Sequence, residues 1–178
     1  MRSLGKVQIR SWPLVGVIAA RVGTLFVDRD SLRSLPTTLS TLTEVLRNEG
    51  TVYVTPEGTT WCGHGAGPFK PAVFQSAIDG GVPVRPIALR YRVAGGGPTT
   101  WPAFIGDETL IDSVRRVAAL RGLVIDVHVL PEIAPGRAAD RHELTALAEA
   151  AIRDTLYGDL PAVPHGVRDP GKGSALEI

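Results

Sequence analysis

The chain has 178 residues, of which 44% are hydrophobic and 21% are charged, a composition that fits one globular domain and excludes a wholly disordered protein. Its single cysteine excludes an intramolecular disulfide and a cysteine-rich zinc site. No apolar run approaches the ~20 residues of a membrane-spanning helix, because the longest candidate, residues 14–27, contains Arg21. The N-terminus is basic and has no apolar core, so we expect no export.

Charge is distributed unevenly along the chain. The net charge is +1, but residues 1–92 carry 11 Lys and Arg against 6 Asp and Glu, while residues 93–178 carry 8 against 12. The first part is therefore +5 and the second −4. A basic first half suits an anionic substrate or an anionic lipid surface, and an incidental split is the alternative.

The first predicted helix follows Ser11, a residue type that caps helix N-termini. Its apolar residues repeat at helical spacing, at Val15, Ile18, Ala19 and Val22. With Trp12 at its start, this stripe faces either the core or a membrane interface, and we favour the core. A strand is predicted next over residues 24–28, and it brings Arg29 to its carboxyl end.

The remaining predicted elements alternate between helices and strands. Helices are predicted over residues 34–49, 72–79, 109–121 and from Asp140, which forms a capping box with Glu143, and strands over residues 51–54, 84–91 and 123–130. This order favours an α/β domain with a mostly parallel sheet flanked by helices. We expect it to occupy residues 1–157 and the Pro- and Gly-rich residues 158–178 to form a disordered tail.

The stretch from Gly50 to Pro71 carries the candidate site. It begins with a predicted buried strand, and Glu57 follows where the chain leaves that strand. In open α/β sheets, ligands bind at the carboxyl ends of strands. Gly58 allows backbone N–H groups to approach an anion, and Lys70 supplies a cation at the end of the loop. The alternative is a polar turn in which Glu57 is merely solvated.

Three sequence blocks share a family resemblance. They are Gly-Thr-Leu-Phe-Val-Asp-Arg at residues 23–29, Pro-Glu-Gly-Thr-Thr at residues 56–60, and Gly-Gly-Val-Pro-Val-Arg-Pro at residues 80–86. In this order and at this spacing they resemble the glycerolipid acyltransferase family, typified by 1-acyl-sn-glycerol-3-phosphate acyltransferase. The resemblance runs from about residue 6 to about residue 113 and implies the α/β fold of the glycerol-3-phosphate acyltransferases.

The resemblance implies an acyltransferase of phospholipid biosynthesis. Such an enzyme moves an acyl group from a thioester donor to the hydroxyl of a lysophospholipid such as 1-acyl-glycerol-3-phosphate. Its partners would be that acceptor, acyl coenzyme A or acyl carrier protein as co-substrate, and a membrane surface, with no cofactor, metal or nucleic acid. We expect a cytoplasmic protein that is peripheral to the inner face of the membrane.

The resemblance also assigns binding roles to single residues. Arg29 matches the arginine that binds the phosphate of the acceptor, although without the resemblance a salt bridge to a neighbouring aspartate would be favoured. Glu57 and Gly58 match the family's acceptor-site block. Thr60 stands where many members have arginine, so one phosphate contact is lost or passes to a lysine. The expected substrate-binding residues are Lys6, Arg29, Glu57, Gly58, Thr59, Thr60 and Lys70.

The family's catalytic pair is a His-x-x-x-x-Asp motif whose histidine is the general base. None of the four histidines in this chain has an aspartate five positions later, so we assign no catalytic residue. We expect an N-terminally truncated domain with little or no acyl transfer of its own. It would be either a fragment of a working enzyme, with Met1 internal to it, or a catalytically silent lipid- or acyl-donor-binding module. A thiol hydrolase built on Cys62 and His64 is a third interpretation, but no acid is placed to orient that pair.

Overall fold

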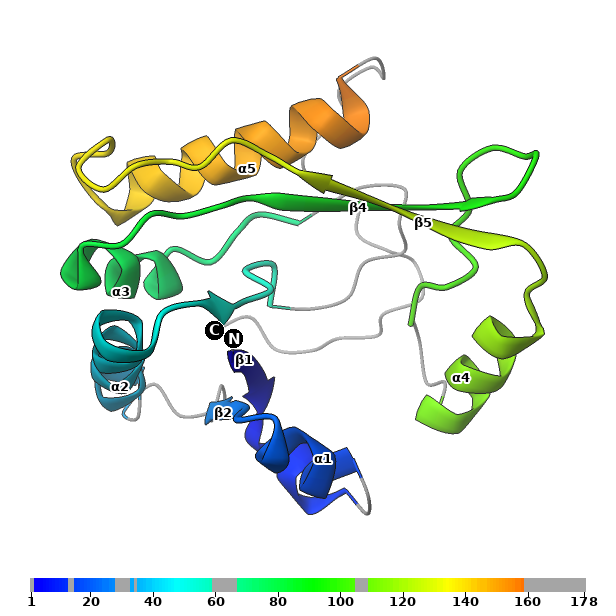
Figure 1. The fold of residues 1–178 in the computed structure, drawn as a ribbon, viewed down its shortest axis with the longest axis horizontal. Helices are drawn as coiled ribbons and strands as arrows, with labels where there is room; N and C mark the ends of the chain where they lie inside the picture. Colours follow the sequence, from blue (N-terminus) through cyan, green and yellow to red (C-terminus); the bar gives the residue numbers. More distant parts are fainter. Residues whose placement is uncertain are drawn as a thin grey trace. The chain divides into compact units, whose positions relative to one another are not determined.

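The structure is a computed structural model (Figure 1). It describes residues 2–12, 15–27, 33, 35–58, 67–104 and 109–158. The chain divides into two compact units, and each is described by itself. The first unit contains residues 1–58, 69–84 and 132–148, and the second contains residues 59–68, 85–131 and 149–178.

Three short parallel strands form the sheet of the first unit. They are β1 (Arg2–Lys6), β2 (Leu25–Val27) and β3 (Val52–Tyr53), in the order β2-β1-β3. Leu4 of β1 pairs with Leu25 on one side, and Arg2 pairs with Val52 on the other. The predicted strands at β2 and β3 are confirmed, but the sequence predicts no strand at β1, which contains Gly5 and a single large apolar residue. Pairing along both edges, rather than strand propensity, makes this segment the central strand.

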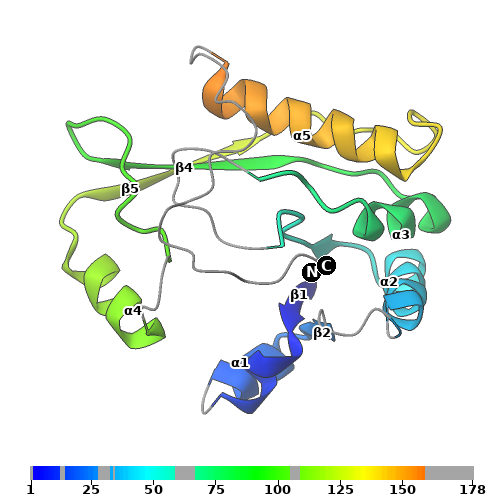
Figure 2. The same ribbon diagram turned by 180° about the vertical axis from the view of Figure 1, so that it is seen from behind.

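Two helices hold the core of the first unit. They are α2 (Leu35–Glu49) and α3 (Ala72–Gly80), which lie side by side in both views (Figures 1 and 2). Their buried apolar side chains are Leu42, Val45, Phe74 and Ala77. The Ser76 side chain is fully buried between the helices, and its hydroxyl donates to the carbonyl of Leu39 at 3.0 Å. Both helices agree with the sequence prediction.

The first helix does not bury its apolar stripe. The 3-10 helix η1 (Val7–Ser11) precedes α1 (Val15–Arg21), and the only buried residue of α1 is Gly16. Ile18 is 60% exposed and Val22, just after the helix, is 59% exposed. The expectation that this stripe faces the core is therefore wrong, because the periodicity that defines a stripe does not fix which way it points.

The second unit is built on an antiparallel strand pair, β4 (Ile87–Val93) and β5 (Leu123–Val129). Leu89 lies opposite Val127, and Arg92 forms an ion pair with Asp126 at 2.8 Å. Parallel pairing holds for the three strands of the first unit but not for these two. β4 begins directly after Pro86, three residues later than predicted, because proline has no N–H to donate to a strand ladder.

Two further helices follow β4 and β5 in the chain. Helix α4 (Leu110–Ala119) is capped by Thr109, and α5 (Arg141–Tyr157) begins after Asp140, whose carboxylate accepts from the N–H of His142 at 2.7 Å and of Glu143 at 2.9 Å. The carboxylate of Glu143 accepts in return from the N–H of Ala139. Within the second unit, Arg90 of β4 donates to the last turn of α5. The predicted tail beyond Gly158 lies outside the described residues.

Among the residues that the structure describes, no helix combines the length and the apolar character needed to cross a bilayer.

Candidate functional site

The candidate site begins with a tight turn after β3. Gly58 has φ 72°, a left-handed conformation that glycine adopts without steric cost. Its N–H donates to the carbonyl of Thr55 at 3.3 Å, and the N–H of Lys70 donates to the carbonyl of Pro56 at 2.8 Å. The second bond joins the two ends of the loop between these residues. Glu57 is thereby held, half-buried, at the base of this loop.

Lys70 lies against Gly58. A Cβ atom added at Gly58 would sit 3.6 Å from Cγ and 3.9 Å from Cε of Lys70, so the aliphatic stem of the lysine covers the glycine. Lys70 remains exposed, which leaves its ammonium group available to an anionic ligand. The turn therefore combines a carboxylate, on the residue before Gly58, with a cation that lies against that glycine.

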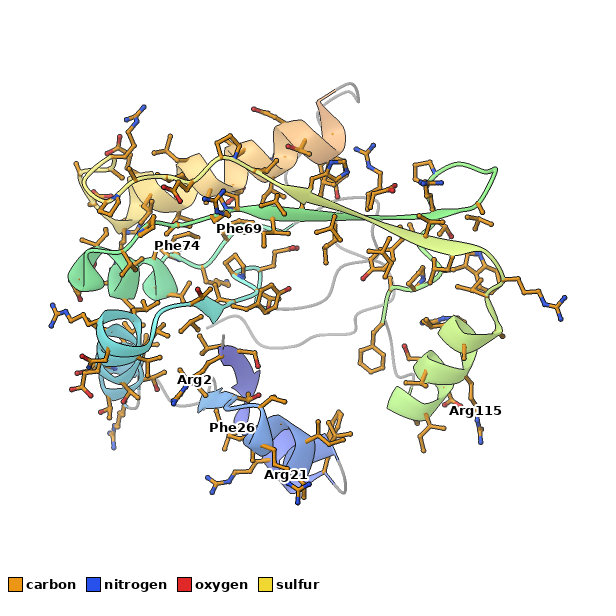
Figure 3. The ribbon with its side chains drawn as sticks, viewed as in Figure 1. Arg2, Arg21, Phe26, Phe69, Phe74 and Arg115 are labelled. Atoms are coloured by element: carbon orange, nitrogen blue, oxygen red, sulfur yellow. The ribbon has the colours of Figure 1, made fainter. Side chains whose placement is uncertain are left out.

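A buried aromatic pair fixes the position of Lys70. Phe69 is 7% exposed and Phe74, in the first turn of α3, is 5% exposed. Their rings stack with centroids 6.5 Å apart and planes 16° apart (Figure 3). Because Phe69 is packed against α3, the neighbouring Lys70 is held at the turn by the core and not by its own side chain.

The carboxyl ends of three parallel strands meet at one edge of the sheet. Lys6 ends β1 and is paired with Val27, which ends β2, while the Glu57–Gly58 turn follows β3. The structure thus brings Gly58 and Lys70 into contact, with Glu57 beside them, and places the backbone of Lys6 at the same edge. The side chain of Lys6 and the whole of Arg29, Thr59 and Thr60 lie outside the described residues, as do Cys62 and His64.

A shallow groove that the sequence does not predict lies between β1, β2 and α2. It has a volume of about 270 Å³ and is lined by Leu4, Leu25, Phe26, Thr37, Thr38, Thr41 and Leu42. Its wall is apolar, and the threonines of α2 add hydroxyl groups. The strand that carries Leu4 was not predicted. Nothing in the sequence alone brings this strand and α2 together.

Among the described residues, no group of three or more His, Cys, Asp or Glu side chains is arranged so that it could hold a metal ion. The arrangement at the turn is suited to binding: a cation and a carboxylate can hold an anionic or zwitterionic head group that carries hydroxyls.

Comparison with known proteins decides the family. Residues 1–90 match the acyltransferase family, and this segment contains all seven of the expected substrate-binding residues. The chain belongs to the acyltransferase family. This match does not test whether the chain lacks the His-x-x-x-x-Asp pair of the family.

Individual members of the acyltransferase family resemble the chain over most of its length. It is 38% identical over 156 residues to the lyso-ornithine lipid O-acyltransferase of Pseudomonas aeruginosa, covering 87% of this chain and 59% of that protein. It is 33% identical over 156 residues to the 1-acyl-sn-glycerol-3-phosphate acyltransferase of Neisseria gonorrhoeae, covering 88% and 61%. The chain therefore spans about three fifths of the length of these two relatives.

The fold of the acyltransferase family is also found by structural comparison. The chain matches the crystal structure of the 1-acyl-sn-glycerophosphate acyltransferase PlsC from Thermotoga maritima with a TM-score of 0.55, covering 87% of this chain and 55% of that one. At 18% sequence identity, this similarity concerns the fold alone. It agrees with the predicted α/β acyltransferase fold.

Proposed function

We propose that this chain is part of an enzyme that transfers an acyl group from a thioester to the free hydroxyl of a single-chain membrane lipid. Its own contribution is to hold the lipid acceptor at the Glu57–Gly58 turn. The observation that carries the proposal is the contact between Lys70 and Gly58 at the end of β3, where α/β folds bind ligands. Membership of the acyltransferase family supplies the reaction.

Each residue of the turn has a distinct task in this proposal. Lys70 pairs with the anionic part of the head group, and Glu57 accepts hydrogen bonds from its hydroxyl or ammonium groups. Gly58 supplies the left-handed conformation that the turn requires, and the lysine stem lies beside it. We assign no general base to the chain, because none of its histidines is followed by an aspartate at the family's spacing.

Two acceptors fit the site. A lysophosphatidate would use the phosphate contacts expected of Arg29 and Lys70. A lyso-ornithine lipid is the second candidate, because Thr60 replaces an arginine that many family members have and because the relative with 38% identity carries that activity in its name. The donor is a thioester of coenzyme A or of acyl carrier protein. Because both acceptors are membrane lipids, the proposal includes a peripheral position at the cytoplasmic face of a membrane.

Acceptor binding to the 178-residue chain tests the proposal. Calorimetric titration with a soluble, short-chain lysophosphatidate should show about tenfold weaker binding for Lys70→Ala, the loss expected for one hydrogen bond to a charged group. Arg137→Ala removes another exposed cation of the same unit and should leave binding unchanged. Equal affinities for the chain and for Lys70→Ala would refute the assigned role.

Activity measurements test whether this chain alone transfers an acyl group. Labelled acyl thioester is supplied with lysophosphatidate or with a lyso-ornithine lipid, and the two-chain product is quantified. Binding of an acceptor with little or no transfer is the expected result, both for a fragment of a working enzyme and for a catalytically silent module. Transfer at the rate of other family members would show that a base other than the His-x-x-x-x-Asp pair operates here.

A further inference from the structure

The N-terminal segment of the chain is basic and contains no acid. Residues 1–27 include Arg2, Lys6, Arg10 and Arg21 but no Asp or Glu, so their side chains carry a charge of +4. Asp28 is the first acidic residue of the chain. A segment of this charge is attracted to an anionic surface.

The same segment exposes several apolar side chains. Exposed fractions are 40% for Trp12, 38% for Val15, 54% for Val17, 60% for Ile18 and 59% for Val22. Residues of a helix are separated by about 100°, which puts Val15, Ile18 and Val22 on one side and the buried Gly16 on the other. We call these five side chains, with Arg10 and Arg21, the α1 surface.

The two arginines of the α1 surface belong to its two helical elements. Arg10 is exposed on η1, and its guanidinium carbon lies 5.9 Å from the ring centroid of Phe26. Arg21 is exposed in the last turn of α1, and its side chain extends away from β1 and β2 (Figure 3). Cations thus accompany the apolar side chains along the surface, and Trp12 has the amphipathic ring typical of membrane interfaces.

A second exposed apolar helix provides a contrast. On α4, Ile111 is 62% and Val114 is 58% exposed, with the same three-residue spacing as Val15 and Ile18. Residues 101–121 contain three acids and three arginines, so this region has no net charge. Apolar exposure is therefore common to both helices, but of these two helical regions the α1 surface is the one with an excess of cations.

We propose that the α1 surface docks the protein onto a membrane that contains anionic lipids, with the apolar side chains entering the interface and the arginines meeting head groups. This proposal rests on the proposed function in one respect, namely that the lipid acceptor lies in a membrane. A second copy of the chain is a poorer occupant, because pairing two α1 surfaces would bring their arginines together with no acid to meet them.

Vesicle flotation of the full chain tests this assignment. Vesicles of phosphatidylcholine are compared with equimolar phosphatidylcholine and phosphatidylglycerol, and the chain should bind the anionic vesicles preferentially. Ile18→Ser/Val22→Ser should reduce that binding at least about tenfold, and the matched control Ile111→Ser/Val114→Ser should not. Arg10→Gln/Arg21→Gln should abolish the preference for anionic vesicles, while Arg115→Gln/Arg121→Gln should leave it intact.

The outcomes separate this inference from the proposed function. Circular dichroism establishes that each variant is folded, and if the serine variant unfolds, the glutamine variant carries the test. Equal losses for the α1 and α4 variants would overturn the assignment, as would an α1-dependent dimer in lipid-free buffer. Binding of a soluble lysolipid without vesicles should be unchanged in the α1 variants and weakened in Lys70→Ala, so each proposal can fail alone.

Discussion

Helices α2 and α3 and the margin of the same unit are built in opposite ways. The margin comprises α1, the turn at residues 56–58 and the exposed residue Asp140, which caps α5. Between α2 and α3, Ser76 is 0% and Phe74 is 5% exposed, whereas Val17 and Ile18 of α1 are 54% and 60% exposed. Packing between the two helices removes apolar surface from water, whereas the apolar side chains of α1 remain exposed to it.

This difference separates stability from ligand access. A buried side chain contributes to stability through packing on all sides, so its truncation destabilises the whole unit. A residue at the margin has few such contacts and can meet a lipid or a head group without disturbing the core. Substitutions between α2 and α3 should therefore lower the free energy of unfolding, while those at the margin should mainly alter binding.

The largest effect is expected for Phe74→Ala. The substitution removes a buried ring on which Phe69 stacks. It should lower the free energy of unfolding by about 3–5 kcal/mol. Ile18→Ala removes an exposed side chain on α1 and should cost less than about 0.5 kcal/mol. Urea denaturation of both variants gives the two values, and similar costs would contradict the contrast between core and margin.

Ser76→Val tests how tightly the helix pair is packed. The serine is fully enclosed, so a larger side chain should cost about 1–3 kcal/mol through overpacking. Ser76→Ala loses only the hydrogen bond to Leu39 and should cost about 0.5–1.5 kcal/mol, since the carbonyl still accepts from the hydroxyl of Thr43 at 2.9 Å. If the valine were tolerated better than the alanine, the interface would be loosely packed.

The helix pair was predictable from sequence, and β1 was not. α2 repeats leucines at helical spacing and α3 ends at a glycine in a left-handed conformation, so both are specified by local signals. β1 has no such signal, because it is a strand only through its partners on both sides. The stripe of α1 was predictable but its direction was not, since periodicity carries no information about what lies opposite.

The candidate site divides in the same way. Glu57 and Gly58 could be proposed from the sequence because they lie in one short segment behind a predicted strand, and Lys70 because it ends the same loop. The groove lined by Leu4, Phe26 and the threonines of α2 was missed because it joins three segments that only the fold brings together. Chemical groups that lie close together in one segment can be recognised from the sequence, whereas a site assembled from separated segments can be recognised only from the tertiary structure.

Gly58→Ala sharpens the contrast within the margin itself. An L-residue at φ 72° should cost about 1–2 kcal/mol, and the added methyl group would lie in van der Waals contact with the Lys70 stem, in the turn that is proposed to bind the head group. Gly136→Ala is the matched control, because its φ of 78° is similar and nothing lies within 4 Å of an added Cβ. Both should lower stability alike in urea denaturation, but only Gly58→Ala should weaken lysophosphatidate binding in calorimetry. If Gly58→Ala and Gly136→Ala weakened lysophosphatidate binding equally, Gly58 would have no specific role in the site.

The smallest effect concerns pH at the start of α5. The N–H groups of Glu143 and His142, in that order of influence, hold the pKa of Asp140 below its ordinary value of 3.8. The ionised carboxylate therefore stabilises the folded chain. This contribution is complete at pH values above the pKa that Asp140 has in the unfolded chain, and it disappears as pH falls through its lower pKa in the folded chain. Asp140→Asn keeps an acceptor for the cap but does not titrate. Thermal unfolding should show a small advantage of aspartate over asparagine above about pH 5 that vanishes in acid. A difference that stays constant from neutral pH into acid would mean that the cap acts through its geometry and not through its charge.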